Sequence, residues 1–172
     1  MKNKNIITYI IGGLLVFSSC KKALEYTPAG VLSSSDLTSP TAIEGLVTAA
    51  YAAIGNGDMI ATMGAFVTRT WQNLFKSISR ANVALRAVNT LNETAFPQKT
   101  KRLAELRFLR AHSYFTMKLL YKNIPIFDEN ATGEDILKTA NDLGDEESWN
   151  KIAADFQFAI DNLPETQPEL GR

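Results

Sequence analysis

The spacing of apolar residues predicts four α-helices after residue 38. In the first, Ser39 can cap the helix and Pro40 suits its first position, and apolar residues then recur at helical spacing as far as Ile54. In the second, residues 66–91, an unbroken stripe of residues three and four positions apart begins at Val67. The stretch between these two helices contains three glycines and is therefore predicted to be a loop.

The predicted third helix, residues 101–121, is apolar on nearly all sides. On one face lie Ala104, Phe108, Ala111, Phe115 and Leu119, and on the opposite side lie Leu106, Leu109, Met117 and Leu120. A helix of this kind belongs inside a bundle, with neighbours on both sides. The connection before it is short, so we expect the second and third helices to form an antiparallel hairpin.

The predicted fourth helix begins at Glu146 and Glu147, whose negative charge suits a helix N-terminus, and stops at Pro164. Its expected apolar face consists of Trp149, Ile152, Ala153, Phe156, Ile160 and Leu163. No helical pattern follows before Arg172. We therefore expect this helix to be the first half of a hairpin, with an apolar face that lacks its partner and makes residues 21–172 marginally stable or prone to aggregate.

The composition is that of an ordinary globular protein. Of the 172 residues, 45% are hydrophobic and 21% are charged, with 18 basic and 18 acidic side chains and a formal net charge of zero. This balance gives no electrostatic support for a polyanionic partner, so we expect no nucleic-acid binding. The length allows a single domain with one sizeable core.

The first residues resemble the signal peptide of a bacterial lipoprotein. Lys2 and Lys4 precede an apolar run, residues 6–17, that is too short to span a bilayer and suits a secretory signal. The run leads directly to Cys20, the only cysteine, in a pattern resembling a lipobox, which implies cleavage after Ser19 and lipid on the Cys20 thiol and amino terminus. The alternative is an incidental thiol, but a lone cysteine forms no internal disulfide, which favours the lipid.

These patterns divide the chain into three parts. We expect a lipoprotein signal peptide over residues 1–19, a lipidated tether over residues 20–38 and a helical domain over residues 39–172. The tether contains Pro28, Gly30 and a cluster of serines, which are typical of extended segments. Two or three acyl chains would anchor the mature protein without a transmembrane helix.

Few residues in the chain are candidates for catalysis. His112 is the only histidine, on a polar stripe of the third helix with Glu105 and Thr116, and no serine motif, paired-histidine metal site or phosphate loop accompanies it. We therefore expect a protein that is not an enzyme. Trp71 is a weak candidate for stacking on a sugar, but its register on the second helix is that of the core, which favours packing.

Residues 122–145 are predicted to be irregular. Within them, Asp128, Asn130, Thr132 and Gly133 match the first, third, fifth and sixth places of the EF-hand calcium loop. The twelfth place holds Thr139, which cannot supply the bidentate carboxylate. We therefore interpret this segment as a solvated acidic loop, and expect no metal and no cofactor apart from the lipid on Cys20.

Several stretches resemble the SusD/RagB family of starch-utilisation-type outer-membrane lipoproteins. Residues 71–82, Trp-Gln-Asn-Leu-Phe-Lys-Ser-Ile-Ser-Arg-Ala-Asn, resemble its helix with a tryptophan, an isoleucine and an Ala-Asn pair. Residues 105–115 are similar to its Glu-Ala-Arg-Phe-Leu-Arg-Ala segment before Tyr-Phe. Residues 123–126 resemble its Gly-x-Val-Pro-Leu turn, and residues 152–164 its Ile-x-x-Asp-Leu-x-x-Ala-x-x-x-Leu-Pro helix. Relaxed lipoboxes are common in such Bacteroidetes-type lipoproteins, so Phe17 in place of leucine fits the resemblance.

The resemblance implies an all-α fold of tetratricopeptide-like helical hairpins, an α-α superhelix that is incomplete here relative to the family. The segment between Tyr51 and Trp71 is also shorter than usual. The implied function is capture of oligosaccharide at the outer membrane, on the cell surface, and delivery to a TonB-dependent, SusC-like transporter. The alternative is a helical protein-interaction lipoprotein that binds no sugar.

Overall fold

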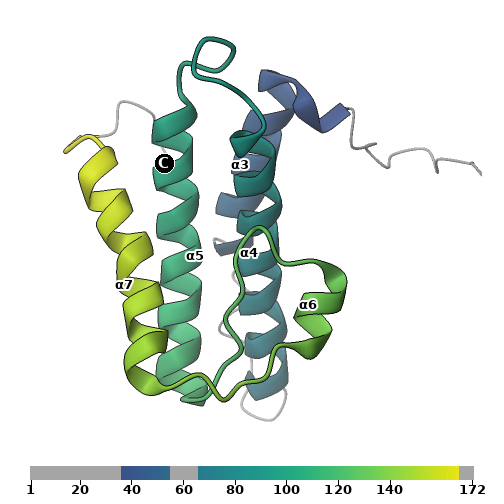
Figure 1. The fold of residues 1–172 in the computed structure, drawn as a ribbon, viewed down its shortest axis with the longest axis vertical. Helices are drawn as coiled ribbons and strands as arrows, with labels where there is room; N and C mark the ends of the chain where they lie inside the picture. The colour runs from purple at the N-terminus through teal and green to yellow at the C-terminus, as the bar shows by residue number, and fades with distance from the viewer. Residues whose placement is uncertain (1–35, 55–65, 167–172) are drawn as a thin grey trace, which may run out of the picture. The chain divides into compact units, whose positions relative to one another are not determined.

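The computed structural model describes residues 36–54 and 66–166, and every regular element within these ranges is helical (Figure 1). The elements are the 3-10 helix η1 (Asp36–Thr38) and the α-helices α3 (Pro40–Ile54), α4 (Phe66–Asn89), α5 (Lys99–Tyr121), α6 (Gly133–Lys138) and α7 (Asp145–Asn162). The predicted all-α fold is confirmed, because the four expected helices are α3, α4, α5 and α7. The predicted signal peptide, Cys20 and most of the predicted tether lie outside the described residues.

Helix α5 occupies the centre of the arrangement. It contacts α3, α4 and α7, and Figure 1 shows it between α4 and α7. Helices α4 and α5 form the predicted antiparallel hairpin, joined by residues 90–98. No helix among the residues that the structure describes is long and apolar enough to cross a membrane.

The helix ends follow the local chemistry. The Ser39 hydroxyl accepts a hydrogen bond from the Ala42 amide at 3.2 Å, so Ser39 caps α3 as predicted. Gly144 occupies the N-cap of α7, and three acidic residues fill the first turn of that helix. Helix α7 ends at Asn162, shortly before Pro164, which lacks the amide that a continuing helix needs.

Two buried clusters lie on different sides of α5. The closed core joins α3, α4, α5 and the α4–α5 connection, and consists of Ile43, Val47, Ala50, Ala84, Leu85, Val88, Phe96, Leu106 and Leu109. The open core joins α4, α5, α7 and the segment after α5, and consists of Leu74, Ile78, Ala111, Tyr114, Met117, Ile124 and Ile152. The first cluster is mainly aliphatic, whereas partly buried aromatic residues surround the second.

The predicted buried faces need two corrections. On α5, Phe108, Phe115, Leu119 and Leu120 are exposed, although the pattern placed them against neighbouring helices. On α7, the face that packs toward α5 is made by Ser148, Ile152, Asp155 and Ala159, whereas Ala153 and Ile160 are exposed. The buried face of α7 is thus rotated about the helix axis relative to the predicted apolar face. The sequence pattern missed this rotation because an ionic side chain, Asp155, occupies a buried position.

The segment between α5 and α7 is more regular than predicted. Helix α6 lies inside it and begins with a capping box, in which the Thr132 hydroxyl accepts from the Asp135 amide while the Asp135 carboxylate accepts from the Thr132 amide. The chain leaves α5 at Lys122, whose φ of 60° and ψ of −65° form a tight γ-turn, in which the Asn123 amide donates to the Tyr121 carbonyl at 2.6 Å. The prediction of a wholly irregular segment was therefore wrong.

Candidate functional site

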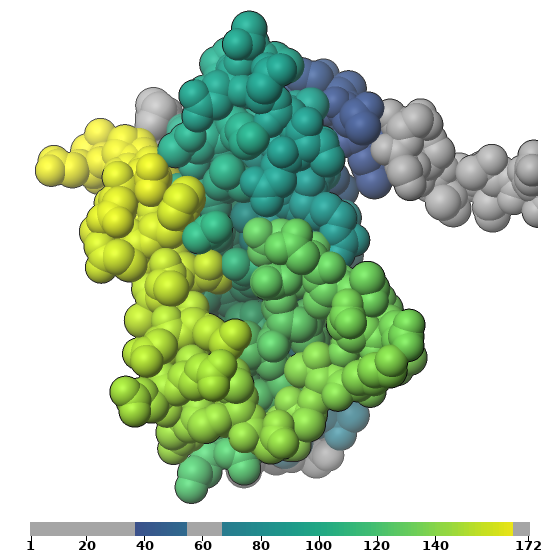
Figure 2. Space-filling model, viewed as in Figure 1, coloured from purple at the N-terminus to yellow at the C-terminus, as the bar shows by residue number. Residues whose placement is uncertain are grey.

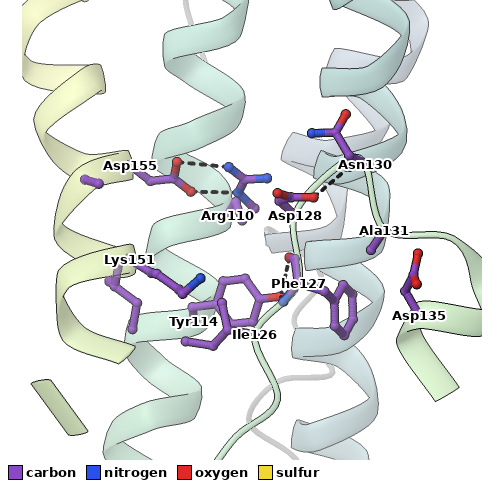
Figure 3. A pocket seen from close by; sticks show the side chains of 12 residues that line it. Arg110, Tyr114, Ile126, Phe127, Asp128, Asn130, Ala131, Asp135, Lys151 and Asp155 are labelled. Atoms are coloured by element: carbon purple, nitrogen blue, oxygen red, sulfur yellow. Dashed lines mark hydrogen bonds and ion pairs between the residues drawn. The ribbon is translucent and has the colours of Figure 1, made fainter. Parts of the chain in front are cut away.

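A pocket of about 510 Å³ lies between α5, α7 and the segment that leads into α6 (Figures 2 and 3). Figure 2 shows the surface hollowed between α7 and the segment that carries α6. The pocket is lined by Arg110, Tyr114, Ile126, Phe127, Asp128, Asn130, Ala131, Asp135, Lys151, Ile152, Ala154 and Asp155. Its volume is in the range of small-molecule sites.

Arg110 holds the inner wall of this pocket together. Its Nε and one terminal nitrogen donate to the two oxygens of Asp155 at 2.6 and 2.9 Å, in the bidentate geometry that guanidinium and carboxylate favour. The other terminal nitrogen donates to Glu129 at 2.6 Å and to Asn82 at 2.8 Å. Arg110 therefore joins α5 to α4, to α7 and to the segment before α6. We call these four residues the Arg110 network.

The charges of the Arg110 network stabilise one another. Burial lowers the pKa of Arg110, but hydrogen bonds and the charges of Asp155 and Glu129 raise it above its ordinary value. Burial raises the pKa of Glu129, but the hydrogen bond and charge of Arg110 bring it below the usual 4.5. The guanidinium and the Glu129 carboxylate are therefore ionised at neutral pH, and four of the five Arg110 N–H donors are directed at protein acceptors.

Side chains from α4 and α5 also hold the backbone of residues 127–131. The Tyr114 hydroxyl donates to the Phe127 carbonyl at 2.9 Å and accepts from the Phe127 amide at 3.1 Å. The Arg86 guanidinium donates to the carbonyls of Glu129 and Ala131 at 2.7 and 3.1 Å. Burial raises the pKa of Tyr114, so this phenol stays protonated and keeps its hydrogen bond. Residues 127–131 form the outer wall of the pocket, and side chains of α4 and α5 thus hold this wall in place.

The pocket offers an apolar floor and a polar rim. Ile126, Ile152 and the ring of Phe127 supply apolar surface. Figure 3 shows Asp128, Asn130, Asp135 and Lys151 around Ile126 and Phe127. The carboxylates accept hydrogen bonds, the amide both accepts and donates them, and the ammonium donates them. This combination suits a small ligand with both apolar faces and many hydroxyl groups.

The calcium-like positions have other partners. The Asp128 carboxylate accepts from the Asn130 amide at 2.8 Å, and Thr132 caps α6. Within residues 36–54 and 66–166, no three His, Cys, Asp or Glu side chains are grouped so as to hold a metal ion. The carboxylates of Asp128 and Asp135 serve local hydrogen bonds and line the pocket.

Two residues singled out in the sequence lie outside the pocket. Trp71 is half-buried beside the open core, with its ring centroid 4.8 Å from those of both Phe75 and Tyr121. His112 is half-buried on α5, where its ring stacks with Phe108 at 6.4 Å. The predicted polar stripe around His112 was partly wrong, because Glu105 is buried.

Sequence reasoning missed the Arg110 network as a site. The signal was nevertheless present, since Asn82, Arg110 and Asp155 all lie in the stretches that carry the family resemblance. Glu129 had no such signal, because it lies in a segment that the pattern left irregular. These motif residues fix the helices and the outer wall of the pocket relative to one another.

The chain belongs to the SusD-like family. The family model described as "Starch-binding associating with outer membrane" matches residues 25–170, nearly the whole chain. The residues of the Arg110 network all lie within this match.

Two curated relatives carry the same family name. The chain is 30% identical over 105 residues to a SusD-like protein of Bacteroides ovatus. The aligned residues cover 59% of this chain and 19% of that protein. The chain is also 26% identical over 106 residues to SusD-like protein P25 of Formosa agariphila. Here the aligned residues cover 62% of this chain and 20% of that protein. The chain thus spans about a fifth of the length of the curated relatives it matches.

Proposed function

We propose that this chain is a lipid-anchored outer-membrane protein that binds oligosaccharide and delivers it to a TonB-dependent, SusC-like transporter. The family match over residues 25–170 carries the proposal, because the family description names starch binding and association with the outer membrane. Anchoring, display on the cell surface and delivery to the transporter are our additions. The protein binds and releases its ligand without breaking a bond.

The anchor in this proposal is lipid on Cys20, which lies outside the described residues. The signal-like residues before it and its place as the only cysteine support this role. Cells fed labelled palmitate should incorporate label into the full chain and not into a Cys20→Ala variant. Protease shaving of intact cells tests display, and full protection of the protein would contradict it.

The pocket beside the Arg110 network is the place in this chain that best suits a sugar. A pyranose has apolar C–H faces, which fit against Ile126, Ile152 and Phe127, and hydroxyl groups, which can bond to Asp128 and Lys151. Because four of the five Arg110 N–H donors are occupied by protein acceptors, we assign the contacts with hydroxyl groups to the rim.

A steric block of the pocket tests this assignment. The full chain, expressed with its own leader, is run in native gels containing amylopectin and titrated with malto-oligosaccharides in a calorimeter. Ala154 is exposed and lines the pocket, so Ala154→Arg fills it while leaving the Arg110 network intact. We expect at least a tenfold loss of affinity, about 1.4 kcal/mol.

Asn150→Arg is the matched control, because Asn150 is exposed on the same helix and does not line the pocket. If Ala154→Arg and the unmodified chain bind malto-oligosaccharides with equal affinity, the sugar site lies elsewhere in the chain. Trp71→Ala is then the next variant to test. Lack of retention on amylopectin and on every other polysaccharide tried would contradict sugar binding itself. Co-purification with a barrel transporter tests the delivery step.

The alternative function is a helical protein-interaction lipoprotein that binds no sugar. One observation favours it, namely the exposed apolar side chains of α5 and α7, because contiguous exposed apolar surface marks sites of protein contact. Protein partners combined with no retention on polysaccharide would support this alternative over sugar capture.

A further inference from the structure

Both cations that line the pocket already have carboxylate partners. Arg110, which is only 6% exposed, donates to Asp155 at 2.6 and 2.9 Å and to Glu129 at 2.6 Å (Figure 3). The Lys151 ammonium lies 3.8 Å from a carboxylate oxygen of Glu147, one turn earlier on α7. The positive charge of each lining cation is therefore offset by a neighbouring carboxylate.

The Arg110 guanidinium lacks the free edge that an anionic ligand needs. Arginine binds carboxylate and phosphate groups best through two parallel N–H groups. The edge formed by Nε and one terminal nitrogen is taken by Asp155, and the other terminal nitrogen donates to Glu129 and Asn82. The remaining N–H can donate to one ligand oxygen, close to Asp155 because the same nitrogen donates to that carboxylate. A hydroxyl group tolerates this neighbour, whereas a carboxylate is repelled by it.

Two carboxylates of the pocket, by contrast, carry a charge that no ion pair offsets. Asp128 accepts a hydrogen bond from the Asn130 amide at 2.8 Å. Asp135 accepts from the amide and the hydroxyl of Thr132 at 2.8 and 2.7 Å. These donors are neutral, and neither carboxylate forms an ion pair with another residue in the part of the chain that the structure describes. The rim of the pocket therefore presents negative charge to a ligand.

We infer that the pocket selects uncharged and amino sugars over acidic sugars, and that Asp128 and Asp135 set this preference. The inference rests on the proposed sugar binding and adds the class of sugar to it. Sugar hydroxyl groups donate hydrogen bonds to these carboxylates, and an ammonium group is attracted to both. A uronic acid instead brings a further carboxylate to a pocket whose lining cations are already paired.

Three ligands that differ only at C6 of each ring test the preference. They are maltotriose, the derivative with an amine in place of each C6 hydroxyl, and the derivative with each C6 oxidised to a carboxylate. The full chain, expressed with its own leader, is titrated with each ligand in a calorimeter at about pH 7, where the amine and the carboxylate are both charged. We expect the amine to bind at least about threefold more tightly than maltotriose and the carboxylate at least about threefold more weakly.

Salt separates a charge effect from a steric one. Raising the ionic strength from about 0.02 M to about 0.5 M should bring the three affinities together, because salt screens exposed charges. A pocket that simply lacks room at C6 would instead reject both derivatives, and salt would leave that rejection unchanged.

Asp128→Asn and Asp135→Asn test the two residues. Asparagine keeps a side-chain oxygen for the local hydrogen bond but removes the charge. Each variant should narrow the gap between maltotriose and the carboxylate at least about twofold. The matched control is Asp142→Asn, because Asp142 is exposed, does not line the pocket and loses the same charge. It should leave the gap unchanged, and circular dichroism checks that all three variants remain helical.

Equal or tighter binding of the carboxylate, with maltotriose still bound, would overturn the inference and leave sugar binding intact. So would a gap that persists in high salt, or one that Asp128→Asn and Asp135→Asn change no more than Asp142→Asn does. If the unmodified chain binds none of the three ligands, the inference is also overturned, and retention on polysaccharide in the native gels then decides separately on the proposed function.

Discussion

Helix α5 separates two regions that are built differently. The closed core buries aliphatic side chains from α3, α4 and α5, and residues such as Leu85 and Leu106 are fully inaccessible. The open core depends on aromatic residues that stay half-buried or exposed, and the Arg110 network lies beside it. On the first side apolar packing holds the helices together, whereas on the second charge-assisted hydrogen bonds position α7 and the segment before α6.

Two buried arginines of α5 illustrate the difference. Arg102 donates to Glu105 in its own helix at 2.9 Å and to Glu44 of α3 at 2.8 Å, so it links two elements that already share the closed core. Arg110 links α5 to three other parts of the chain. Since apolar contact is thinner on the side of α7, more of the structure there depends on one guanidinium group. Three experiments test this comparison.

The largest effect is expected from Arg110→Met. This change leaves the carboxylates of Asp155 and Glu129 close together, buried and without their cation. Breaking a buried ion pair in this way costs about 3–5 kcal/mol. Urea denaturation of residues 21–172, followed by circular dichroism, should show this loss in the free energy of unfolding.

The matched control for that change is Arg69→Met, since Arg69 is exposed on α4. It should cost less than about 0.5 kcal/mol, the usual range for surface substitutions. Equal costs for the two arginines would mean that the Arg110 network contributes no more than a surface charge, and that α7 is held by apolar contacts alone.

A pair of truncations compares the two cores directly. Leu85→Ala removes a fully buried side chain from the closed core and should cost about 2–5 kcal/mol. Phe156→Ala removes a larger side chain, but one that is only half-buried beside the open core, so we expect about half that cost. Thermal and urea unfolding both provide the measurement. A Phe156→Ala variant less stable than Leu85→Ala would show that the aromatic packing contributes more than its exposure indicates.

Most of the fold could be predicted from the apolar pattern. Helices α3, α4, α5 and α7 were expected near their observed bounds, because caps such as Ser39 and breaks such as Pro164 mark their ends. The short α6 was missed, since six residues without a buried side chain carry no apolar period. Its signal was the pair Thr132 and Asp135, a capping box with aspartate in place of the usual glutamate or glutamine.

The candidate site was much harder to predict. Apolar periodicity assigns charged residues to the solvent, so it misplaced Asp155 and Glu105, which are buried because each bonds an arginine of α5. The pocket forms only where residues of α5, α7 and the segment before α6 lie side by side. These residues are far apart in the chain, so no local sequence pattern predicts that they come together. The family motifs did include Asn82, Arg110 and Asp155, although they gave no sign of Glu129 and revealed no geometry.

The smallest effect is expected from Glu129→Gln, and it should be present near neutral pH and disappear in acid. Because the folded chain holds the pKa of Glu129 below the usual 4.5, this carboxylate stabilises the fold above that pH. Its contribution is lost as pH falls through the lowered pKa, since protonation removes its charge beside Arg110. Glutamine keeps a hydrogen-bond acceptor but does not titrate, so the stability of the variant should fall less steeply with acid.

The measurement is the urea midpoint between about pH 7 and about pH 3. Trp149 of α7 provides the fluorescence signal, in a Trp71→Phe background that removes the other tryptophan. Asp142→Asn is the control, because Asp142 is exposed ahead of α7 and should leave the steepness unchanged. If Glu129→Gln and the unmodified chain lose stability equally in acid, Glu129 does not couple the Arg110 network to pH. The next group to test is then the exposed carboxylate of Asp145, whose pKa is lowered by Lys118.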